Sequence, residues 1–115
     1  MRFLESQEFP EFEWNERKSE SNLEKHGFDF DDAISVFEQP HLVDPCDFPD
    51  EERLLAIGLL EGVEIAVIYT IRNQNCRVIS ARRARKNERR AYHQAIRWLE
   101  GEGQDRLGTG QKPDR

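Results

Sequence analysis

Three strand-like segments joined by very short turns constrain the fold of this chain more than any other feature. They are residues 53–60, 63–72 and 76–84. Only residues 61–62 and 73–75 lie between them. Connections of this length join antiparallel neighbours, because a parallel crossover needs about a dozen residues or more. The sequence therefore predicts an antiparallel meander, and a further short strand is expected at residues 41–43.

Two helical segments precede the meander. The first, residues 16–26, follows a cap at Asn15 and ends before Gly27, which suits the left-handed position after a helix. It carries one aliphatic residue, Leu23, so we expect a thin packing face that leans on nearby aromatic side chains, namely Trp14, Phe28 and Phe30. The second helix starts after Asp29, with Asp32 at the capping-box position. Its apolar residues follow helical spacing at Phe30, Ala33, Ile34 and Phe37.

A last helix is expected at about residues 88–99, where apolar side chains recur on one side at Ala91, Tyr92, Ala95 and Leu99. The order α-α-β-β-β-α predicts an α+β fold with helices packed against an antiparallel sheet. We expect one domain over residues 12–100, opened by a short extended piece at 12–15. Residues 1–11 are expected to form a loose leader. Residues 101–115, with four glycines and little apolar content, are expected to be a disordered tail.

The composition points away from membranes and metals. The longest run without polar side chains, residues 54–60, is far short of the ~20 residues that span a bilayer. Glutamates interrupt the first eleven positions, where a targeting leader would be basic and then apolar. Cys46 and Cys76 match neither a disulfide framework nor a metal-ligand spacing, and His41 and His93 show no such spacing either. We therefore expect a soluble cytoplasmic protein with free thiols, no cofactor and no membrane partner.

The charge of the chain is strongly divided. The whole sequence carries a formal charge of −6. Residues 72–98 hold nine lysines or arginines and one acid, Glu88, for a net +8. The remainder holds eight bases and 22 acids, for a net −14. This division predicts a basic stripe on an acidic body, which suits a polyanion on one side and a basic partner elsewhere.

The basic residues surround the junction between the last strand and the last helix. Regular alternation would place Val78, Ser80 and Arg82 on one face of the strand, and Ile79, Ala81 and Arg83 on the other. The basic run continues with Arg85, Lys86, Arg89 and Arg90. Cations in the first helical turn oppose the helix dipole, at a cost of ~0.3–1 kcal/mol each when exposed. A bound anion would offset this cost, because helix N-termini and arginine forks both accept phosphate.

A structural explanation is available for the same residues. Charged runs are usually solvated surface, and these arginines can pair with carboxylates of the acidic remainder. Within the run itself, Glu88 is the one acid. The imbalance favours an external anion, either an RNA or DNA phosphate or an acidic protein. Composition does not choose among them, although direct DNA recognition is weaker because no helix-turn-helix or zinc-finger spacing is present.

Four separated motifs resemble the BrnT family of bacterial toxins. They are "FEWNERKSESNLEKHGFDFDDAISVF", the "EER…IG" of residues 51–58, the "IYT" of residues 68–70, and "RVISARRARKNERRAY". The likeness covers residues 12–92 in consistent order. It implies the toxin of a type II toxin–antitoxin pair, with a RelE-like fold and ribonuclease action on RNA that shuts down translation. It also implies an antitoxin, BrnA, with a ribbon-helix-helix domain, so operator DNA is reached only indirectly through that partner.

The family pattern can be carried over residue by residue. It falls on Trp14, Lys18, Asn22, Lys25, His26, Gly27, Arg53, Gly58, Ser80, Ala81, Arg82, Ala84, Glu88 and Tyr92. One departure is Asn15, where the family usually shows Asp, and either residue caps a helix. The proline-rich loop at 45–49 and the C-terminal tail are not accounted for by the family.

RNA carries its own nucleophile, the 2′-hydroxyl, so a metal-independent ribonuclease needs only a base, an acid and cations around the phosphate. The expected products are a 2′,3′-cyclic phosphate and a 5′-hydroxyl. The candidate catalytic residues are Lys25, His26, Arg53, Arg82 and Glu88. The candidate substrate-binding residues are Lys18, Arg77, Arg83, Arg85 and Tyr92.

Each catalytic candidate has a chemical reason. Arg82, with Arg53 or Arg83, is expected to bind the phosphate and stabilise its charge. An unperturbed histidine titrates near pH ~6.5, so His26 suits either base or acid. Lys25 would stabilise charge or donate a proton, and Glu88 would act as a base.

The same side chains also have structural interpretations. Histidine favours a helix C-terminus, and a glutamate in the first turn of a helix favours its N-terminus. Tyr92 lies on an apolar helical face and is expected either to stack on a base or to belong to the core. Arg53 begins a strand and would discourage edge-to-edge aggregation. The rival function is therefore a non-catalytic binding module whose basic stripe docks an acidic protein or a nucleic acid.

Overall fold

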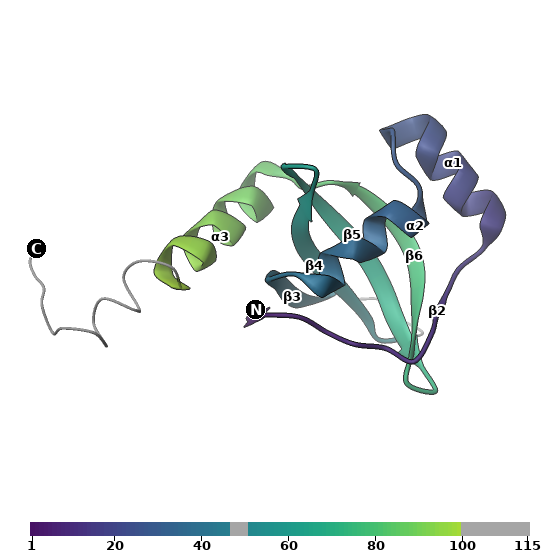
Figure 1. Ribbon diagram of the computed structural model, residues 1–115, viewed down its shortest axis with the longest axis horizontal. Coiled ribbons are helices and arrows are strands. Elements are labelled where there is room, and N and C mark those ends of the chain that lie inside the picture. Colours follow the sequence, from purple (N-terminus) through teal and green to yellow (C-terminus); the bar gives the residue numbers. More distant parts are fainter. Residues whose placement is uncertain (47–50, 100–115) are drawn as a thin grey trace, which may run out of the picture.

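The meander predicted from the short turns forms the centre of the computed structural model, which describes residues 1–46 and 51–99 (Figure 1). Within these residues six strands form one sheet in the order β1-β3-β4-β5-β6-β2. The strands are β1 Arg2–Leu4, β2 Phe12–Glu13, β3 His41–Cys46, β4 Arg53–Leu60, β5 Val63–Arg72 and β6 Asn75–Arg83. The helices are α1 Glu16–His26, α2 Phe30–Ala33, the 3-10 helix η1 Ile34–Glu38, and α3 Lys86–Arg97. The α+β class is confirmed.

Both hairpins of the meander close through two-residue turns with positive φ angles. Glu61 and Gly62 have φ angles of 52° and 82°, and Asn73 and Gln74 have φ angles of 52° and 73°. Two consecutive left-handed residues are the geometry whose twist matches paired strands. The second turn is therefore one residue shorter than expected, and β6 begins at Asn75.

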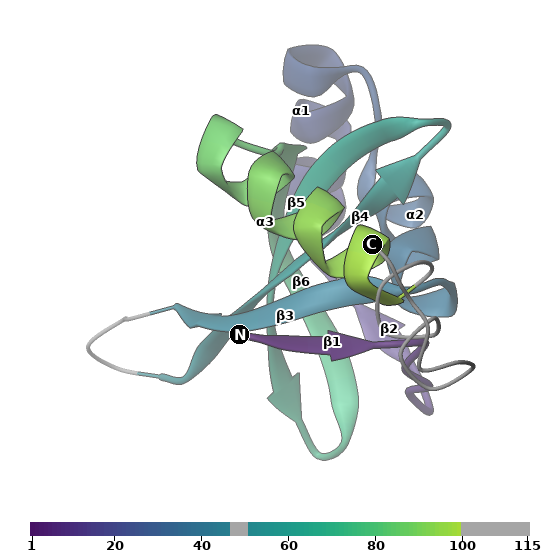
Figure 2. The same cartoon turned by 90° about the vertical axis from the view of Figure 1, so that its left-hand side faces the viewer.

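The expectation of a loose leader at residues 1–11 is corrected by the edges of the sheet. Strand β1 pairs antiparallel with β3, and Figure 2 shows the two running side by side. The N–H of Gln7 donates to the carbonyl of Phe37 at 2.7 Å, and the ring of Phe9 packs edge-on against Phe37. Strand β2 pairs in parallel with the start of β6, so the sheet extends beyond the antiparallel meander.

Helix α1 has the predicted ends but a different mode of packing. Asn15 accepts a hydrogen bond from the N–H of Lys18, and Gly27 has a φ angle of 87°, which confirms both caps. Leu23, however, is 48% exposed. Helix α1 is held instead by two buried polar side chains. Ser19 Oγ accepts from the N–H of Phe30 at 3.0 Å, and Asn22 Nδ2 donates to the carbonyl of Phe28 at 2.9 Å.

The second helix begins with the predicted capping box between Asp29 and Asp32 and then tightens into η1. It packs closely on β4 at Gly58, where an added Cβ would lie 2.9 Å from Val36 Cβ. Gln39 then exchanges two hydrogen bonds of 2.8 Å with the backbone of Leu59, which fixes the end of η1 on the sheet. Together α2 and η1 cover the main core.

Helix α3 covers part of the opposite face of the sheet (Figures 1 and 2). It starts at Lys86, two residues earlier than expected. Its residue Tyr92 packs in a second core with Leu42, Ile57 and Ala66. The expected tail at 101–115 lies outside the described residues.

The core contains one fully buried histidine. The Nδ1 of His41 lies 2.7 Å from the carbonyl oxygen of Gln39, and its Nε2 lies 2.8 Å from Gln7 Oε1. Burial lowers the pKa of His41 below its usual value. Cys46 and Cys76 form no disulfide in the described residues, as expected, and burial raises the pKa of Cys76 to about 12.

Candidate functional site

A cavity between α1 and the edge of β6 gathers cationic side chains from both elements. Its volume is about 390 Å³, and we call it the central cavity. Its wall consists of Lys18, Ser21, Asn22, Lys25, His26, Phe30, Ile79, Ser80, Ala81 and Arg82. Three of the predicted catalytic residues, Lys25, His26 and Arg82, therefore line one cavity, although Arg82 is far from the other two in the sequence.

The strand order explains why α1 lies beside β6. Strand β2 pairs with β6 at only two positions, Phe12 with Cys76 and Glu13 with Arg77. The chain then turns at Asn15 into α1, so the remainder of the β6 edge faces this helix rather than another strand. The polar docking of α1 fixes the distance between helix and strand.

A β-bulge in β6 changes which side chains share a face. Ile68 pairs with Ser80, but the next residue of β5, Tyr69, pairs with Val78, so Ile79 is an extra residue. Val78 therefore lies in the core beneath α2 and not on the face of Ser80, which corrects the regular alternation expected for this strand. Bulges of this kind often re-aim side chains near functional sites.

The bulge also aligns two arginines that regular alternation would separate. Arg77 pairs with Thr70, and Arg82 pairs with Ala66. Thr70 and Ala66 are four residues apart on β5 and share a face, so their partners share it too. Arg83, paired with Ile65, points to the opposite face.

Arg82 and Glu88 form a bidentate ion pair at the junction of β6 and α3. The Nη1 of Arg82 donates to Glu88 Oε1 at 2.8 Å, and Nη2 donates to Oε2 at 3.0 Å. Glu88 Oε1 also accepts the N–H of Arg85 at 2.7 Å. The two side chains are only 25% and 10% exposed. The hydrogen bonds from Arg82 hold the pKa of Glu88 below its usual range, and those to Glu88 raise the pKa of Arg82.

Lys25 and His26 add an ammonium group and an imidazole to the wall of the central cavity from the last turn of α1. The helix dipole stabilises cations at this position. Neither side chain forms an ion pair with any residue in 1–46 or 51–99. An anion entering the cavity would therefore meet cationic groups that the described part of the protein does not already neutralise.

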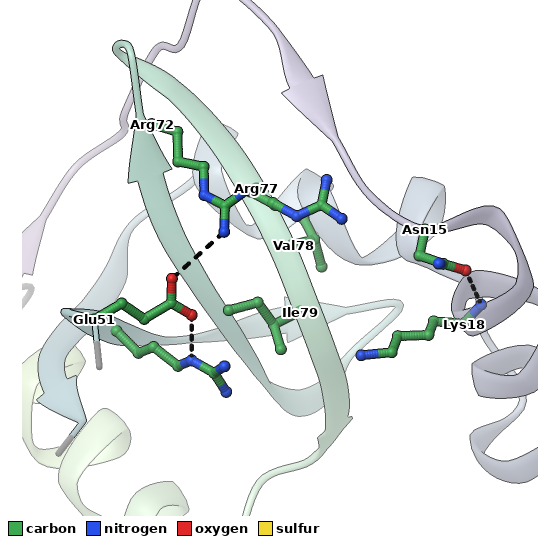
Figure 3. Close-up of a pocket in the computed structure, with 8 residues that line it drawn as sticks. Asn15, Lys18, Glu51, Arg72, Arg77, Val78 and Ile79 are labelled. Atoms are coloured by element: carbon green, nitrogen blue, oxygen red, sulfur yellow. Dashed lines mark hydrogen bonds and ion pairs between the residues drawn. The ribbon is translucent and has the colours of Figure 1, made fainter. Parts of the chain in front are cut away.

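A smaller cavity of about 150 Å³ adjoins the central cavity and shares Lys18 and Ile79 with it. We call it the basic cavity, and its wall consists of Asn15, Lys18, Glu51, Arg53, Arg72, Arg77, Val78 and Ile79 (Figure 3). Glu51 accepts a hydrogen bond from Arg53 Nε at 2.8 Å and lies 3.6 Å from Arg72 Nη2. The hydrogen bond from Arg53 lowers the pKa of Glu51. Arg53 thus lies on the face of Arg82 but in a different cavity.

Arg83 lines a third cavity, of about 250 Å³, which shares His26 with the central cavity. Asp32 and Glu61 also line it. The structure therefore separates Arg82 from both of the arginines that the sequence offered as its alternative partners at one phosphate. Of the three, Arg82 lines the cavity that holds both Lys25 and His26, Arg83 shares a cavity with His26, and Arg53 lines the basic cavity.

The remaining predicted residues have local roles in the structure. Tyr92 is 4% exposed within the second core, so its ring has no open face on which a base can stack. Arg85 caps α3 through its backbone, and its side chain is exposed. Sequence reasoning missed Arg72, although the two-residue turn that pairs it with Asn75 places it on the face of Arg77.

No group of three or more histidine, cysteine or acidic side chains is arranged to hold a metal ion within residues 1–46 and 51–99. The helices in this same part of the chain are all too short or too polar to cross a bilayer.

Comparison with known proteins places the site within a described family. Residues 14–88 match the family model described as "Ribonuclease toxin, BrnT, of type II toxin-antitoxin system". The match contains both walls of the central cavity and ends at Glu88. No curated protein sequence matches the chain.

Proposed function

The chain belongs to the BrnT family of type II toxin–antitoxin ribonuclease toxins, and from this membership we propose that its central cavity is the site of RNA cleavage. One observation carries the proposal: the fold brings Lys25, His26 and Arg82 around one open cavity. A positively charged cavity of this size admits a ribose-phosphate unit. The reaction class follows from the family, and the assignment of residues follows from the geometry.

The contacts of Arg82 indicate which of its atoms would bind the phosphate. A guanidinium group has five N–H donors. Nη1 donates to Glu88 Oε1 and to the carbonyl of Arg83, and Nη2 donates to Glu88 Oε2. Within the described residues, Nε–H and the second N–H of Nη2 have no acceptor. These two donors form one edge of the guanidinium plane, and an edge of this kind binds a phosphate through two parallel hydrogen bonds.

We assign Glu88 the role of a positioning residue. Both of its oxygens are engaged by Arg82, and its pKa is lowered, so it is a weak proton acceptor. Glu88 holds the guanidinium in one orientation and leaves the Nε–Nη2 edge without an acceptor among the described residues. Preorganised donors of this kind stabilise developing charge more effectively than mobile ones.

Lys25 and His26 are the proposed proton-transfer and charge-stabilising groups. A base removes the proton of the 2′-hydroxyl, and O2′ forms a bond to phosphorus. The bond from phosphorus to the 5′-oxygen breaks, and an acid donates a proton to that oxygen. The products are a 2′,3′-cyclic phosphate and a 5′-hydroxyl, and no metal ion enters the balance. His26 is one of the two proton-transfer groups of this scheme. Lys25 neutralises the extra negative charge and, where His26 is the base, donates the proton to the 5′-oxygen.

The family membership leads to a wider proposal about the cellular role. We propose that cleavage inhibits translation in the cytoplasm and that a BrnA-like ribbon-helix-helix antitoxin neutralises the protein, with operator DNA bound only through that antitoxin. The net −14 outside residues 72–98 suits a partner with a basic segment. A RelE-like arrangement of a single domain at residues 12–100 belongs to the same proposal.

The test is incubation of the purified protein with end-labelled RNA in EDTA, with analysis of the product ends. We expect 2′,3′-cyclic phosphate termini, and no cleavage where the attacking ribose is replaced by 2′-deoxyribose. Stable RNA binding without cleavage by folded protein would favour the rival reading as a binding module. Cleavage that stops when EDTA is added would contradict the metal-independent mechanism.

A further inference from the structure

We infer that the basic cavity holds a second phosphate of the RNA chain, one that is not cleaved. This inference rests on the proposed function, because it takes the central cavity as the site of the scissile phosphate. It adds a subsite of defined position and chemistry, and it adds Arg72 to the residues that bind substrate.

The charges around the basic cavity are unbalanced. Four cationic side chains line it, from Lys18, Arg53, Arg72 and Arg77. Among its described lining residues the one carboxylate is Glu51, and two of the arginines share it. Arg77 has a contact with Glu13 at 3.3 Å. Grouped cations repel one another, and a bound phosphate would relieve that repulsion.

Arg72 is held loosely enough to turn toward a ligand. Its Nη2 lies 3.6 Å from Glu51 Oε1, which is longer than an ordinary hydrogen bond, and its side chain is 55% exposed. Exposed ion pairs of this kind contribute little to folding. Figure 3 shows the Arg72 guanidinium and the Lys18 side chain on opposite sides of the cavity, both extending toward Ile79 between them. The arrangement is therefore better explained by an anion than by stability.

The bulge at Ile79 places this cavity on the route of a bound strand. It puts Arg77 and Arg82 on the same face, as the pairing with β5 shows. Their partners on β5, Thr70 and Ala66, are four residues apart, so the two arginines lie ~13 Å apart along the sheet, which is longer than one nucleotide. The phosphate in the basic cavity is therefore at least one nucleotide removed from the scissile phosphate. Lys18 and Ile79 belong to both cavities, so the path between them is continuous.

This continuity favours RNA over an acidic segment of the antitoxin. A strand bound at Arg82 reaches the basic cavity without crossing another surface, and Ile79 offers an apolar contact for a ribose or base at the junction. Arginine forks also match phosphate geometry. An acidic peptide could bind to the cationic side chains of the basic cavity alone. Its binding would not require the basic cavity and the central cavity to share Lys18 and Ile79.

The experiment compares a non-cleavable 2′-deoxy dinucleotide, which carries one internal phosphate, with longer 2′-deoxy oligonucleotides that carry an added phosphate one or two nucleotides away on the 5′ or the 3′ side. Binding to the full-length protein is measured by NMR titration. An added phosphate on one of the two ends is expected to tighten binding about tenfold, because a charge-assisted contact is gained. In Arg72→Gln this gain is expected to disappear, while affinity for the dinucleotide with one phosphate changes less than about twofold. Arg90→Gln, an exposed arginine on α3, is the matched control and should behave as wild type.

Cleavage assays separate this inference from the proposed function. If wild-type protein cleaves RNA but neither added phosphate tightens binding, the subsite is wrong and the proposed function stands. If the added phosphate tightens binding through Arg72 but no RNA is cleaved, the subsite stands and the proposed function is wrong. An equal loss of affinity for every ligand in Arg72→Gln would show a structural role and overturn the subsite. The subsite would also be overturned if Arg72→Gln bound RNA as tightly as wild type but bound the antitoxin more weakly.

Discussion

Replacing Glu88 by Gln tests whether this residue positions Arg82 or acts as a base. The carboxylate accepts two hydrogen bonds from Arg82 and one from the N–H of Arg85. Glutamine keeps one acceptor oxygen but turns an amide N–H₂ toward the guanidinium and removes the charge. A charge-assisted hydrogen bond contributes ~1.5–3 kcal/mol, so we expect the free energy of unfolding to fall by about 2–3 kcal/mol.

The same substitution should reduce catalysis without changing its pH dependence. A guanidinium that is no longer held by the carboxylate moves relative to the phosphate. A misplacement of ~1 Å can lower the rate by ~10²-fold. We therefore expect kcat to fall about 10- to 100-fold in Glu88→Gln. If Glu88 were the base, the acidic limb of the pH–rate profile would vanish in the variant. Persistence of that limb is the result expected for a positioning residue.

The stability of the variant has its own pH signature. The pKa of Glu88 is depressed in the folded state, so its contribution is present above the unfolded pKa of ~4.3 and is lost as pH falls through the lower folded value. Urea unfolding of wild type and Glu88→Gln should therefore differ most above pH ~4.5 and converge in acid. Glu38→Gln, at an exposed residue of η1, is the control and should follow wild type. Equal stability of wild type and Glu88→Gln at neutral pH would refute the reasoning.

Three further predictions concern the scaffold. Asn22→Ala should lower the free energy of unfolding by about 1–3 kcal/mol, because the buried carbonyl of Phe28 loses its donor. Hydrogen exchange of the backbone amides in α1 should become faster in this variant, and unchanged exchange would contradict the polar docking of α1. Gln74→Gly should raise the free energy of unfolding by about 1 kcal/mol in a urea titration, because glycine adopts the φ angle of 73° without strain. A loss of stability would contradict the turn assignment. Burial lowers the pKa of His41 in the folded state, so the unfolded chain binds the extra proton. Wild-type stability should therefore fall as pH drops below ~6.5 in urea titrations, and a flat profile between pH ~6.5 and ~5 would count against it.

Local signals in the sequence were sufficient for most of the fold. The two short turns fixed the meander, and the caps at Asn15, Gly27 and Asp29 fixed where helices begin or end. Each of these signals acts within a few residues, so a single sequence contains it. Strand β1 has no such signal, because its pairing with β3 joins segments almost forty residues apart. The sequence therefore predicts a loose leader where the structure has a paired strand.

The sequence predicts candidate residues for the site but not their arrangement. Lys25, His26 and Arg82, which the family resemblance singles out, line one cavity in the structure. Their grouping depends on the bulge at Ile79 and on the polar docking of α1, and neither is visible in periodicity. In the sequence Glu88 is the one acid of the basic run, and nothing singles out Arg82 as its partner. The bidentate geometry of the pair favours the proposed positioning role of Glu88 over the role of a base.

Single-turnover cleavage of RNA by wild type, Arg82→Ala and the control Arg90→Ala tests the central claim most directly. The account predicts that Arg82→Ala is folded and cleaves ~10²–10³-fold more slowly, while Arg90→Ala cleaves at the wild-type rate. Cleavage by Arg82→Ala at the wild-type rate would show that the phosphate is bound elsewhere, and the central cavity would then not be the active site.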